Sequence, residues 1–375
     1  MTRTLVVTND FPPRTGGIQS FVHALVERQP PDSIVIHASN SAGAAAFDAG
    51  AGYPVVRHHG SLLLPVPAVA RAAADLIGRF GIDTVLFGAA MPLGLLAPRL
   101  RAAGARRLIG LTHGHEAAWA VVPGGDRVLR RVAAGLDVIT FLGPFTGSRI
   151  AGALRPVDRA KLVRLHPGVD PVRFAPGPGP VRRAQLGLAH RPVVVCVSRL
   201  VPRKGQDTLI AALPAVRAEV PEVCLLIVGG GPYLRRLRDQ VRRRGLGDHV
   251  RFTGPVPDAD LPGYYGAGDV FAMPCRTRRR GLDVEGLGMV FLEASACGLP
   301  VVAGDSGGAP EAVLEGVTGT VVDGHSVAAV AAALNRFLTD TALAAKLGTA
   351  GRDWVSDDWG WDAQAARLRQ LLVGD

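Results

Sequence analysis

The segment VVVCVSRLVPRKGQDTLIAALPAVRAE, residues 193–219, combines a short apolar run, a polar loop and a longer amphipathic stretch. Residues 193–197 are all apolar, and a run of five is too short for a helix, so they predict a strand covered on both faces of a parallel sheet. Residues 206–219 predict the helix that follows. Together they predict one strand–helix unit of an α/β domain.

The same alternation extends through both halves of the chain. It predicts two doubly wound, Rossmann-like α/β domains. The other predicted strands are residues 5–8, 34–37, 84–88, 108–112, 138–142 and 162–165 in the first half, and 224–228, 250–253, 270–273 and 300–303 in the second. The other predicted helices of the second half are residues 233–244, 290–297 and 327–347.

Proline and glycine crowd the stretch between the two halves, residues 166–180, where the periodicity disappears. We therefore place the linker there. Doubly wound sheets bind their ligands beyond the C-terminal ends of their strands. Two such domains facing each other predict a deep interdomain cleft, and we expect the chemistry in that cleft.

Composition and charge narrow the class of protein. The 375 residues suffice for two domains, and a chain that is 48% apolar and 20% charged is not disordered. The net charge is +10, of which +8 falls in residues 1–175 and +2 in residues 176–375. Such a basic excess attracts anionic lipid, nucleic acid or phosphorylated small molecules, and charge alone does not choose among them.

No targeting or membrane-spanning segment is expected. Residues 1–10 have a short apolar core, far from what a secretory signal requires. The longest stretch without charge or histidine, residues 84–98, is interrupted by Pro92 and Gly94 and is shorter than a bilayer span. The four cysteines lie far apart, so we expect small apolar core residues in a reducing compartment.

A loop with paired glycines follows the first predicted strand. It reads NDFPPRTGGIQ over residues 9–19, and a helix should begin near Ile18. Gly16 and Gly17 let the backbone approach a ligand, and free N–H groups at the helix start favour a phosphate. The loop lacks the lysine of a Walker A loop and the GxGxxG of a dinucleotide fold. An anion-binding loop is therefore favoured over a plain turn.

Two cations follow the strand at residues 193–197. Arg199 and Lys204 lie on a loop at the C-terminal end of a buried strand, from which both can point into the predicted cleft. There they would hold a diphosphate and stabilise negative charge as it departs. The alternative is solvated surface charge, and the position after a buried strand favours the diphosphate.

Two carboxylates, Glu285 and Glu293, lie eight residues apart. The first is in a glycine-rich loop and the second in a helix, so they can accept hydrogen bonds from two different diols of one ligand. An unpartnered carboxylate in an apolar helix is costly to bury. A ligand contact at Glu293 is therefore favoured over a local backbone cap. The glycine-rich residues 303–311 offer either further N–H groups or a structural turn.

Three polar clusters need separate interpretations. The segment THGHE, residues 112–116, lacks the spacing of a helical zinc site, so His113 is predicted to donate to a phosphate or a sugar hydroxyl. Asp258 and Asp260 stand at the start of a helix, where acids act as caps, so they are not predicted to hold a metal. The run RTRRR, residues 276–280, predicts a mobile cationic lid or a solvated turn, and it lacks the aromatics that stack single-stranded nucleic acid.

Taken together, these motifs resemble a known family. SRLVPRKGQD, VGGGPY, the region around Glu285 and Glu293, and HPGVDPVRF are similar to the retaining glycosyltransferases of the GT-B fold, over nearly the whole chain. NDFPPRTGGIQSF, THGHE and RTRRRGLDVEGLG most resemble the actinobacterial GDP-mannose-dependent phosphatidylinositol monomannoside mannosyltransferases. Enzymes of that family act on the cytoplasmic face of the membrane.

The resemblance implies a domain plan and an activity. Residues 1–170 would bind the acceptor, residues 171–355 the nucleotide-sugar donor, and residues 356–375 would form a helix that crosses back to the first domain. The reaction would transfer mannose with retention from GDP-mannose to a phosphatidylinositol mannoside in α-1,6 linkage, without a cofactor or metal. Implied partners are GDP-mannose, an anionic inositol lipid and the membrane surface, with no nucleic acid, in a cytoplasmic protein.

The resemblance also implies residue roles. Arg199 and Lys204 would bind the donor diphosphate, Glu285 the transferred sugar and Glu293 the ribose. His113 would complete the catalytic set with Arg199, Lys204 and Glu285, with His115 as its alternative. The other implied donor-binding residues are Gly16, Gly17, Phe252, Thr253, Gly254, Val256, Gly286, Gly288, Met289 and Val290, and the implied acceptor-binding residues are Asp10, Gly17, Gln19 and His115.

Alternatives remain at the level of mechanism and of function. No carboxylate is an obvious covalent nucleophile, so same-face attack, in which the leaving phosphate accepts the acceptor's proton, is favoured over double displacement. A transferase of the same fold with another sugar nucleotide and a soluble sugar, cyclitol or natural-product acceptor is the second hypothesis. A non-catalytic protein that binds a nucleotide sugar or a polyanion is the third.

Overall fold

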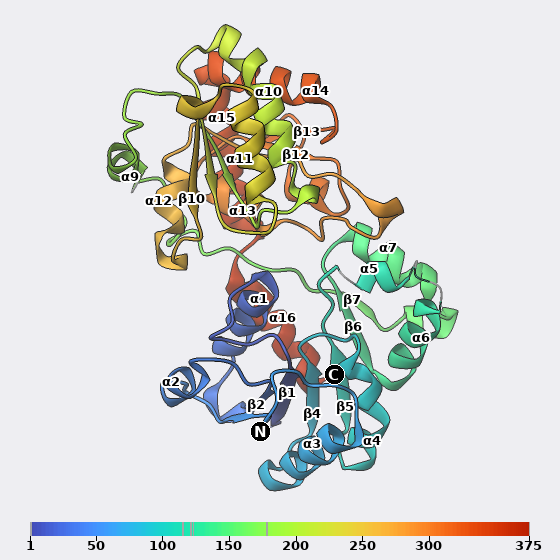
Figure 1. Ribbon diagram of the computed structural model, residues 1–375. Helices are drawn as coiled ribbons and strands as arrows, with labels where there is room; N and C mark the ends of the chain where they lie inside the picture. Colours follow the sequence, from blue (N-terminus) through green and yellow to red (C-terminus); the bar gives the residue numbers. More distant parts are fainter. Residues whose placement is uncertain (1, 115, 121, 123, 178, 375) are drawn as a thin grey trace. The chain divides into compact units, whose positions relative to one another are not determined.

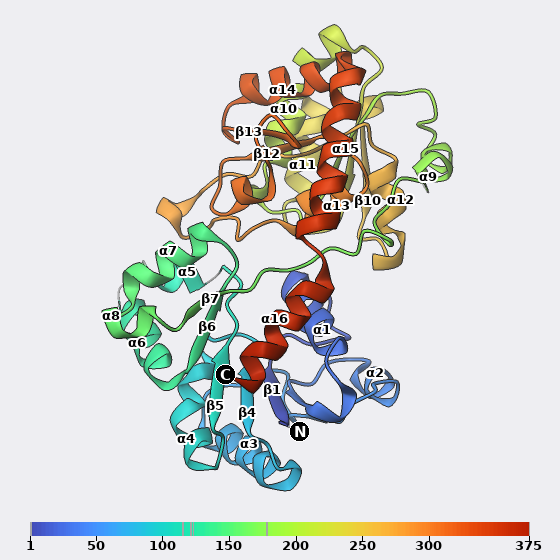
Figure 2. The ribbon, with the colours of Figure 1, turned by 180° about the vertical axis from the view of Figure 1, so that it is seen from behind.

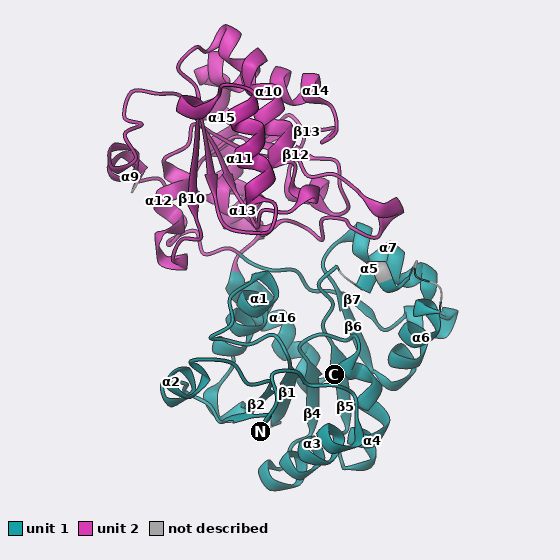
Figure 3. Ribbon diagram, viewed as in Figure 1, with its two compact units in different colours: residues 1–168, 361–375 teal, residues 169–360 magenta. Residues whose placement is uncertain are grey.

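The computed structural model describes residues 2–114, 116–120, 122, 124–177 and 179–374. The chain divides into two compact units, which Figure 3 shows in two colours. Unit 1 comprises Met1–Gly168 and Trp361–Asp375, and unit 2 comprises Val169–Gly360. The boundary at residues 168 and 169 lies inside the proline- and glycine-rich stretch where we placed the linker.

Unit 1 is built on a parallel sheet. Within its described residues the sheet has seven strands in the order β3-β2-β1-β4-β5-β6-β7 (Figure 1). The strands are β1 (Thr4–Thr8), β2 (Ile34–Ala38), β3 (Val55–Arg57), β4 (Thr84–Phe87), β5 (Arg107–Gly110), β6 (Val138–Phe141) and β7 (Leu162–Arg164). The helices are α1 (Gly17–Glu27), α2 (Ala44–Ala49), α3 (Pro67–Phe80), α4 (Ala97–Ala102), α5 (Glu116–Trp119), α6 (Gly125–Gly135), α7 (Pro144–Ala153), α8 (Pro156–Arg159) and α16 (Trp361–Val373).

The last helix, α16, belongs to unit 1 although it follows unit 2 in the chain (Figure 2). It packs against α1, β4 and β5. The Thr84 hydroxyl donates to the carbonyl of Leu372 at 3.0 Å, and the Gln29 amide donates to that of Ala365 at 3.1 Å. Because these bonds are buried, they fix the end of the chain on the first sheet. The returning segment begins at Trp361, later than the residue 356 expected from the sequence.

Unit 2 repeats the architecture. In its described part, the parallel sheet has six strands in the order β10-β9-β8-β11-β12-β13. The strands are β8 (Val193–Val197), β9 (Cys224–Val228), β10 (Val250–Gly254), β11 (Val270–Met273), β12 (Val301–Gly304) and β13 (Gly319–Val322). The helices are α9 (Gly179–Gln185), α10 (Gln206–Glu219), α11 (Leu234–Arg243), α12 (Leu261–Gly266), α13 (Met289–Ala296), α14 (Val327–Thr339) and α15 (Thr341–Asp358).

The predicted strands are confirmed, and two further strands were missed. β3 and β13 are the edge strands that pair with β2 and β12. All three residues of β3 are half-buried, and β13 begins with Gly319 and continues through half-buried residues. β3 has only three residues and β13 begins with glycine and threonine, so neither offers an apolar run of four. The opposite edge strands, β7 and β10, are no better buried and were nevertheless predicted. β8, by contrast, is buried at all five positions.

One predicted helix is wrong. Residues 327–347 form parts of two helices, α14 and α15, which meet at Asp340 with a bend of 97°. The Asp340 carboxylate accepts a hydrogen bond from the N–H of Leu343 at 2.9 Å and so caps α15. The apolar periodicity continues across this cap, which is why the pattern favoured one helix.

Within the described residues, no single helix combines the length and apolar character needed to cross a bilayer, although α14 and α15 meet that criterion as a bent pair. All four cysteines are buried and free of disulfides, as the sequence predicted for core residues.

Strand order creates a switch point in each sheet. In unit 1 the chain builds outward from β1 through β2 and β3 and then returns to the other side of β1 with β4. In unit 2 the chain does the same around β8, with β11 as the returning strand. The loops after the two central strands therefore diverge and leave a crevice at the C-terminal edge of the sheet. Ligand-binding residues are expected in these loops.

Candidate active site

The switch point of unit 2 holds a buried ion pair. Lys204 follows β8, at the end of a short 3-10 helix (Pro202–Lys204), and Glu285 follows β11. The Lys204 Nζ lies 2.7 Å from Glu285 Oε2, and the two side chains are only 10% and 8% exposed. The structure therefore brings together a cation and a carboxylate that the sequence predicted separately.

Gly205 lets the two loops approach. Its φ is +78°, and a Cβ at this position would lie 2.0 Å from the carbonyl oxygen of Pro274, just after β11. Any side chain would collide with backbone, and the left-handed conformation is itself unfavourable for other residues. Glycine at residue 205 thus allows α10 to start directly beside the neighbouring strand end.

Glu285 is held as an ionised carboxylate. Burial acts to raise its pKa, but Lys204, Arg203 and a backbone hydrogen bond from Gly286 together lower the pKa below its ordinary value. The Arg203 Nε lies 3.7 Å from the same Oε2. An ionised carboxylate only accepts hydrogen bonds, so Glu285 is suited to bind ligand hydroxyls.

The glycine-rich loop after β12 holds the backbone of Glu285 in place by hydrogen bonds. The N–H of Gly308 donates to the Glu285 carbonyl at 3.0 Å, and the N–H of Glu285 donates to the Ser306 hydroxyl at 3.3 Å. A Cβ at Gly307 would lie 2.0 Å from the Glu285 carbonyl oxygen. Of the two roles open for residues 303–311, the structural turn is observed, and the Gly308 N–H is engaged within it.

Glu293 lies on α13 and has a partner in unit 2. The Tyr265 hydroxyl of α12 donates to Glu293 Oε2 at 2.5 Å. Burial is the main cause that raises the pKa of Glu293 to about 7, and the negative charge of Asp258 raises the pKa further. The hydrogen bond from Tyr265 and the positive charge of Arg173 act in the opposite direction. The carboxylate predicted to need donors thus has one from Tyr265.

Arg199 and Lys204 are placed differently. Arg199 is exposed, whereas the cation beside Lys204 and Glu285 is Arg203, which also lies 3.7 Å from Asp283. The sequence analysis passed over Arg203, although its position next to Lys204 was a signal. The 3-10 turn at Pro202–Lys204 decides which of the three cations face Glu285.

The other residues with implied donor roles lie in two segments of unit 2. Gly288 caps α13 with φ +85°, and a Cβ there would lie 2.6 Å from the Phe291 ring. At the end of β10, the Gly254 carbonyl accepts a hydrogen bond from Gly229 at 3.0 Å. Half-buried residues of these segments are Phe252, Thr253, Gly254, Val256, Gly286, Gly288, Met289 and Val290.

The loop after β1 forms the switch point of unit 1. The Gln19 amide donates to Asp10 Oδ1 at 2.7 Å, so two residues with implied acceptor roles are in contact. A Cβ on Gly16 would lie 2.4 Å from Gln19 Oε1, and its φ is +156°. A Cβ on Gly17, the first residue of α1, would meet nothing within 4 Å among the described atoms. Gly16 is required by the fold of this loop, whereas Gly17 borders open space.

His113 lies across the same switch point, at the end of β5. Its Nε2 donates to the Gly88 carbonyl at 2.5 Å, and its backbone N–H donates to the Glu116 carboxylate at 2.8 Å. Because a carbonyl only accepts, this bond fixes the proton on Nε2. The ring also packs edge-on against Phe21 of α1. His115, the alternative histidine, lies outside the described residues.

The acidic pair after β10 stands at a helix start, as predicted. Asp258 and Asp260 form the 3-10 turn before α12, and Asp260 occupies its N-cap position, but within the described residues neither side chain makes a capping hydrogen bond. Asp258 pairs instead with Arg173 at 2.6 Å and Asp260 with Arg182 at 3.6 Å.

The run at residues 276–280 is an ordered turn. Arg276 pairs with Asp207 at 2.6 Å, and the backbone of Arg278 bonds to that of Asp283 at 2.9 Å. Arg279 and Arg280 adopt left-handed φ values of 50° and 53°. Of the two predicted forms, the turn is observed, and Arg276 is not solvated but held by an acid.

Metal ligands are not gathered anywhere in the described ranges. No group of three or more His, Cys, Asp or Glu side chains lies close enough to hold an ion.

Comparison with known proteins places the chain among sugar transferases. It is 53% identical to a GDP-mannose-dependent α-(1-6)-phosphatidylinositol monomannoside mannosyltransferase of Mycolicibacterium smegmatis. The aligned region covers 99% of this chain and 98% of that relative. The chain belongs to this mannosyltransferase family. Over its full length it is also 45% identical to 98% of a monoacylated phosphatidylinositol monomannoside mannosyltransferase of Corynebacterium glutamicum.

The fold and a family model agree with that membership. Residues 181–354 match the model for glycosyl transferases group 1, which places the shared glycosyltransferase segment in unit 2. The crystal structure of Anabaena Alr3699/HepE in complex with UDP has a TM-score of 0.83 at 22% identity, with complete coverage of both chains. The two Rossmann-like sheets of this mannosyltransferase family member are thus those of the GT-B fold.

Two positioning residues were missed by sequence reasoning besides Arg203. Tyr265 bonds to Glu293, and Ser306 accepts from the backbone of Glu285. Neither carries a local motif, because each acts on a carboxylate from a different loop or helix. Only strand order brings them beside the residues that the family pattern marks.

Proposed function

We propose that the protein transfers mannose, with retention, from GDP-mannose to a phosphatidylinositol mannoside acceptor in α-1,6 linkage. The observation that carries this proposal is the 53% identity over 99% of the chain to a transferase of that name. The arrangement of Lys204, Arg203 and Glu285 supports it with chemistry, because a nucleotide sugar presents both a diphosphate and hydroxyl groups.

The donor binds to unit 2 in this proposal. Arg199, Arg203 and Lys204 stabilise the negative charge that develops on the diphosphate as the anomeric C–O bond breaks. Glu285 accepts hydrogen bonds from the hydroxyls of mannose, and Glu293 from those of the ribose. Phe252, Thr253, Gly254 and Val256 lie beside the base.

Retention follows from same-face attack. The acceptor hydroxyl attacks the anomeric carbon on the side from which the diphosphate departs, and the departing phosphate oxygen takes its proton. Glu285 serves as a hydrogen-bond acceptor and not as a covalent nucleophile in this proposal, because Lys204 and Arg203 stabilise its negative charge and so weaken it as a nucleophile. Double displacement would need another carboxylate at that face.

Unit 1 binds the acceptor. The loop after β1 and the start of α1 contribute Asp10, Gly17 and Gln19, and His113 follows β5. An adjoining loop adds an apolar edge: Leu62, Leu64 and Val66 are 53%, 47% and 41% exposed. Such neighbouring exposed side chains fit the acyl region of a lipid.

Hydrogen bonds tie the apolar loop to the loop after β1, which carries Asp10. The Asn9 amide donates to the Leu63 carbonyl at 2.9 Å and its oxygen accepts from the Leu63 N–H at 2.6 Å. Arg14 donates to the Ser61 carbonyl at 2.6 Å. In this proposal the protein docks as a peripheral protein on the cytoplasmic face of the membrane, and the exposed leucines of this loop and the basic excess of residues 1–175 support such docking.

The test is a transfer assay with radiolabelled GDP-mannose and phosphatidylinositol monomannoside in vesicles. Label should enter the organic phase, and it should do so equally with and without a chelator, because the proposed mechanism uses no metal. UDP-glucose and ADP-glucose serve as control donors. Label from another sugar nucleotide, or label that stays in the aqueous phase with a soluble acceptor, would overturn the assignment.

A further inference from the structure

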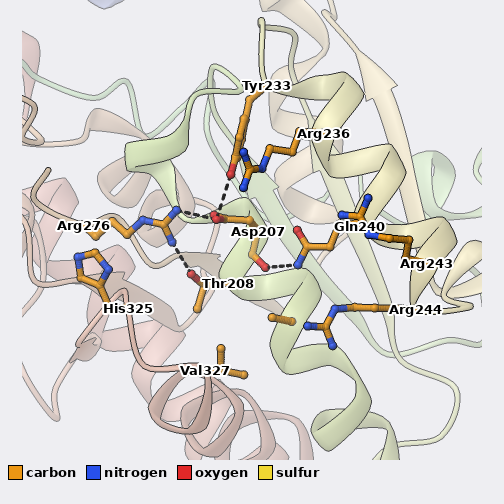
Figure 4. A pocket seen from close by; sticks show the side chains of 11 residues that line it. Asp207, Thr208, Tyr233, Arg236, Gln240, Arg243, Arg244, Arg276, His325 and Val327 are labelled. Atoms are coloured by element: carbon orange, nitrogen blue, oxygen red, sulfur yellow. Dashed lines mark hydrogen bonds and ion pairs between the residues drawn. The ribbon is translucent and has the colours of Figure 1, made fainter.

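Unit 2 contains a cavity among its outer helices, separate from the Lys204–Glu285 pair (Figure 4). Its volume is about 420 Å³, within the range of small-ligand sites. It lies between α10, α11 and the start of α14, with residues from the loops after β11 and β13 completing it. Asp207, Tyr233 and Arg276 stand at the ends of three of the motifs quoted above, but no role in sugar transfer is assigned to any of them.

The cavity is strongly cationic. Among the described residues that line it are four arginines, Arg236, Arg243, Arg244 and Arg276, and a single acid, Asp207. Figure 4 shows these side chains around one opening. Arg236, Arg243 and Arg244 are exposed and Arg276 is half-buried, so an anion that enters the cavity can contact several guanidinium groups.

The single acid is already engaged. Asp207 Oδ2 accepts from Arg276 Nη2 at 2.6 Å and from the Tyr233 hydroxyl at 3.1 Å. Arg276 Nη1 also donates to the Thr208 hydroxyl at 2.7 Å. These bonds hold the Arg276 guanidinium in one position, so ligand binding costs little conformational entropy at this side chain. They leave the other three arginines without compensation from Asp207.

Arg236 lies in the first turn of α11, a turn without acids, where the helix dipole disfavours cations. Arg235 shares that turn without lining the cavity, so this position by itself does not indicate a ligand. The excess of cations at one cavity is what favours an anion: four arginines are among its described lining residues, and the one acid there is already paired with Arg276.

We propose that this cavity binds the phosphate group of a second ligand, distinct from the sugar donor. Guanidinium groups match phosphate oxygens with paired hydrogen bonds. The ligand is either a small phosphorylated molecule or the phosphate of an anionic lipid headgroup. The inference does not depend on which sugar nucleotide the protein uses.

The test uses the full-length protein with saturating GDP, which occupies the donor site, and inorganic pyrophosphate as the probe. The cavity variant is Arg236→Gln with Arg243→Gln. The matched control is Arg235→Gln with Arg238→Gln, which removes the same charge from exposed positions of the same helix that do not line the cavity. Arg276 is left intact, because its side chain also holds Asp207 and Thr208 of α10 in place.

Pyrophosphate should raise Tm by roughly 2–4 °C in the wild type and the control and by much less in the cavity variant. Both variants should keep the wild-type Tm without the probe and the wild-type rate of mannose transfer. The proposal would be overturned if pyrophosphate raised Tm equally in the two variants. It would also be overturned if pyrophosphate left the wild-type Tm unchanged and the vesicles described below did not capture the wild type.

A second arm identifies the source of the phosphate. Co-sedimentation is measured with phosphatidylcholine vesicles with and without phosphatidylinositol. If a lipid headgroup is the ligand, phosphatidylinositol should increase capture of the wild type and the control more than that of the cavity variant. If the ligand is soluble, capture should be equal and only the pyrophosphate shift should differ. Equal behaviour of the two variants in both arms would refute the site.

Discussion

At the switch point of unit 2, charged side chains meet each other, whereas at that of unit 1, polar side chains mostly meet backbone. Lys204, Arg203 and Glu285 form an ion cluster after β8 and β11. After β1 and β5, His113 donates to a carbonyl and Asp10 accepts from the neutral Gln19. Both sheets have the same topology, so the difference lies in the loops alone.

This difference suits two kinds of substrate group. A diphosphate and a sugar offer charge and many hydroxyls, which a cluster of buried charges can bind strongly once water is excluded. An acceptor lipid offers hydroxyls and an apolar body, for which hydrogen-bonded loops beside exposed Leu62 and Leu64 are better suited. The following experiments test whether the two switch points really divide the work in this way.

Loss of the buried cation should have the largest effect. Lys204→Ala should lower kcat/KM by roughly a thousandfold, because a stabiliser of the leaving charge is lost. It should also lower the free energy of unfolding by roughly 3 kcal/mol, because buried Glu285 loses a partner. Steady-state transfer assays and urea melts measure the two effects.

The control for Lys204 is a similar cluster away from the switch points. In unit 1, buried Asp158 is bound by Lys161 at 2.9 Å and Arg155 at 2.7 Å. Lys161→Ala should destabilise the protein comparably while transfer stays near normal. Equal loss of transfer in both variants would mean that Lys204 acts through stability only, and near-normal turnover in Lys204→Ala would remove it from catalysis.

The second effect is the pH dependence of stability that comes from Glu293. Its folded pKa of about 7 lies above its ordinary value of 4.5, so between these pH values the folded state binds more protons than the unfolded state. The free energy of unfolding should therefore fall as pH rises from about 4.5 to about 7, by on the order of 3 kcal/mol from this group.

Denaturant melts of the wild type and Glu293→Gln across this pH window measure that contribution. The difference in unfolding free energy between them should change from about pH 4.5 to about pH 7 and stay constant above pH 7, where the carboxyl is ionised in both states. Tyr265→Phe should extend the dependence to higher pH, because the Tyr265 hydrogen bond lowers the pKa. Parallel curves for wild type and Glu293→Gln would contradict the burial argument.

The two glycines of unit 1 should separate folding from binding. Gly16→Ala should lower stability by about 1–3 kcal/mol, because its Cβ displaces Gln19 and its φ is strained. Gly17→Ala should leave Tm unchanged and raise KM for the acceptor roughly 30-fold, because the added methyl group holds the ligand away from the backbone N–H and a hydrogen bond to a charged group is lost. Unchanged KM in Gly17→Ala would remove this residue from the binding surface.

The smallest effect is expected on membrane binding. Leu62→Ser with Leu64→Ser should weaken co-sedimentation with anionic vesicles roughly tenfold, because two half-exposed leucines no longer enter the lipid. Val157→Ser, which changes a 70% exposed side chain elsewhere in unit 1, is the control. Equal capture of the two proteins would mean that charge alone holds the protein on the membrane.

How much of the site was predictable depends on what each residue relies on. Lys204 and Glu285 could be found because each follows an apolar strand, and an apolar run is visible in the sequence itself. Their pairing could not be found, because β8 and β11 are neighbours only through strand order. The choice of Arg203 over Arg199 as the cation beside Glu285 depends on one 3-10 turn.

The fold shows the same division. The central strands were predicted because both of their faces are buried, while β3 and β13 were missed because the few apolar residues of each form no run. The break at Asp340 was overlooked because apolar periodicity continues across a cap that one side chain provides. Burial of a whole element leaves a pattern in the sequence, whereas a single capping bond leaves very little.

The sequence by itself determined the types of elements, the linker and the loops in which the functional side chains lie, because periodicity, glycine and proline act over a few neighbouring residues. Only the tertiary structure decided which charges meet: Lys204 with Glu285, Asp207 with Arg276, and Asp258 with Arg173. These pairs join segments far apart in the chain, so they depend on how strands order and helices pack, which no local pattern specifies.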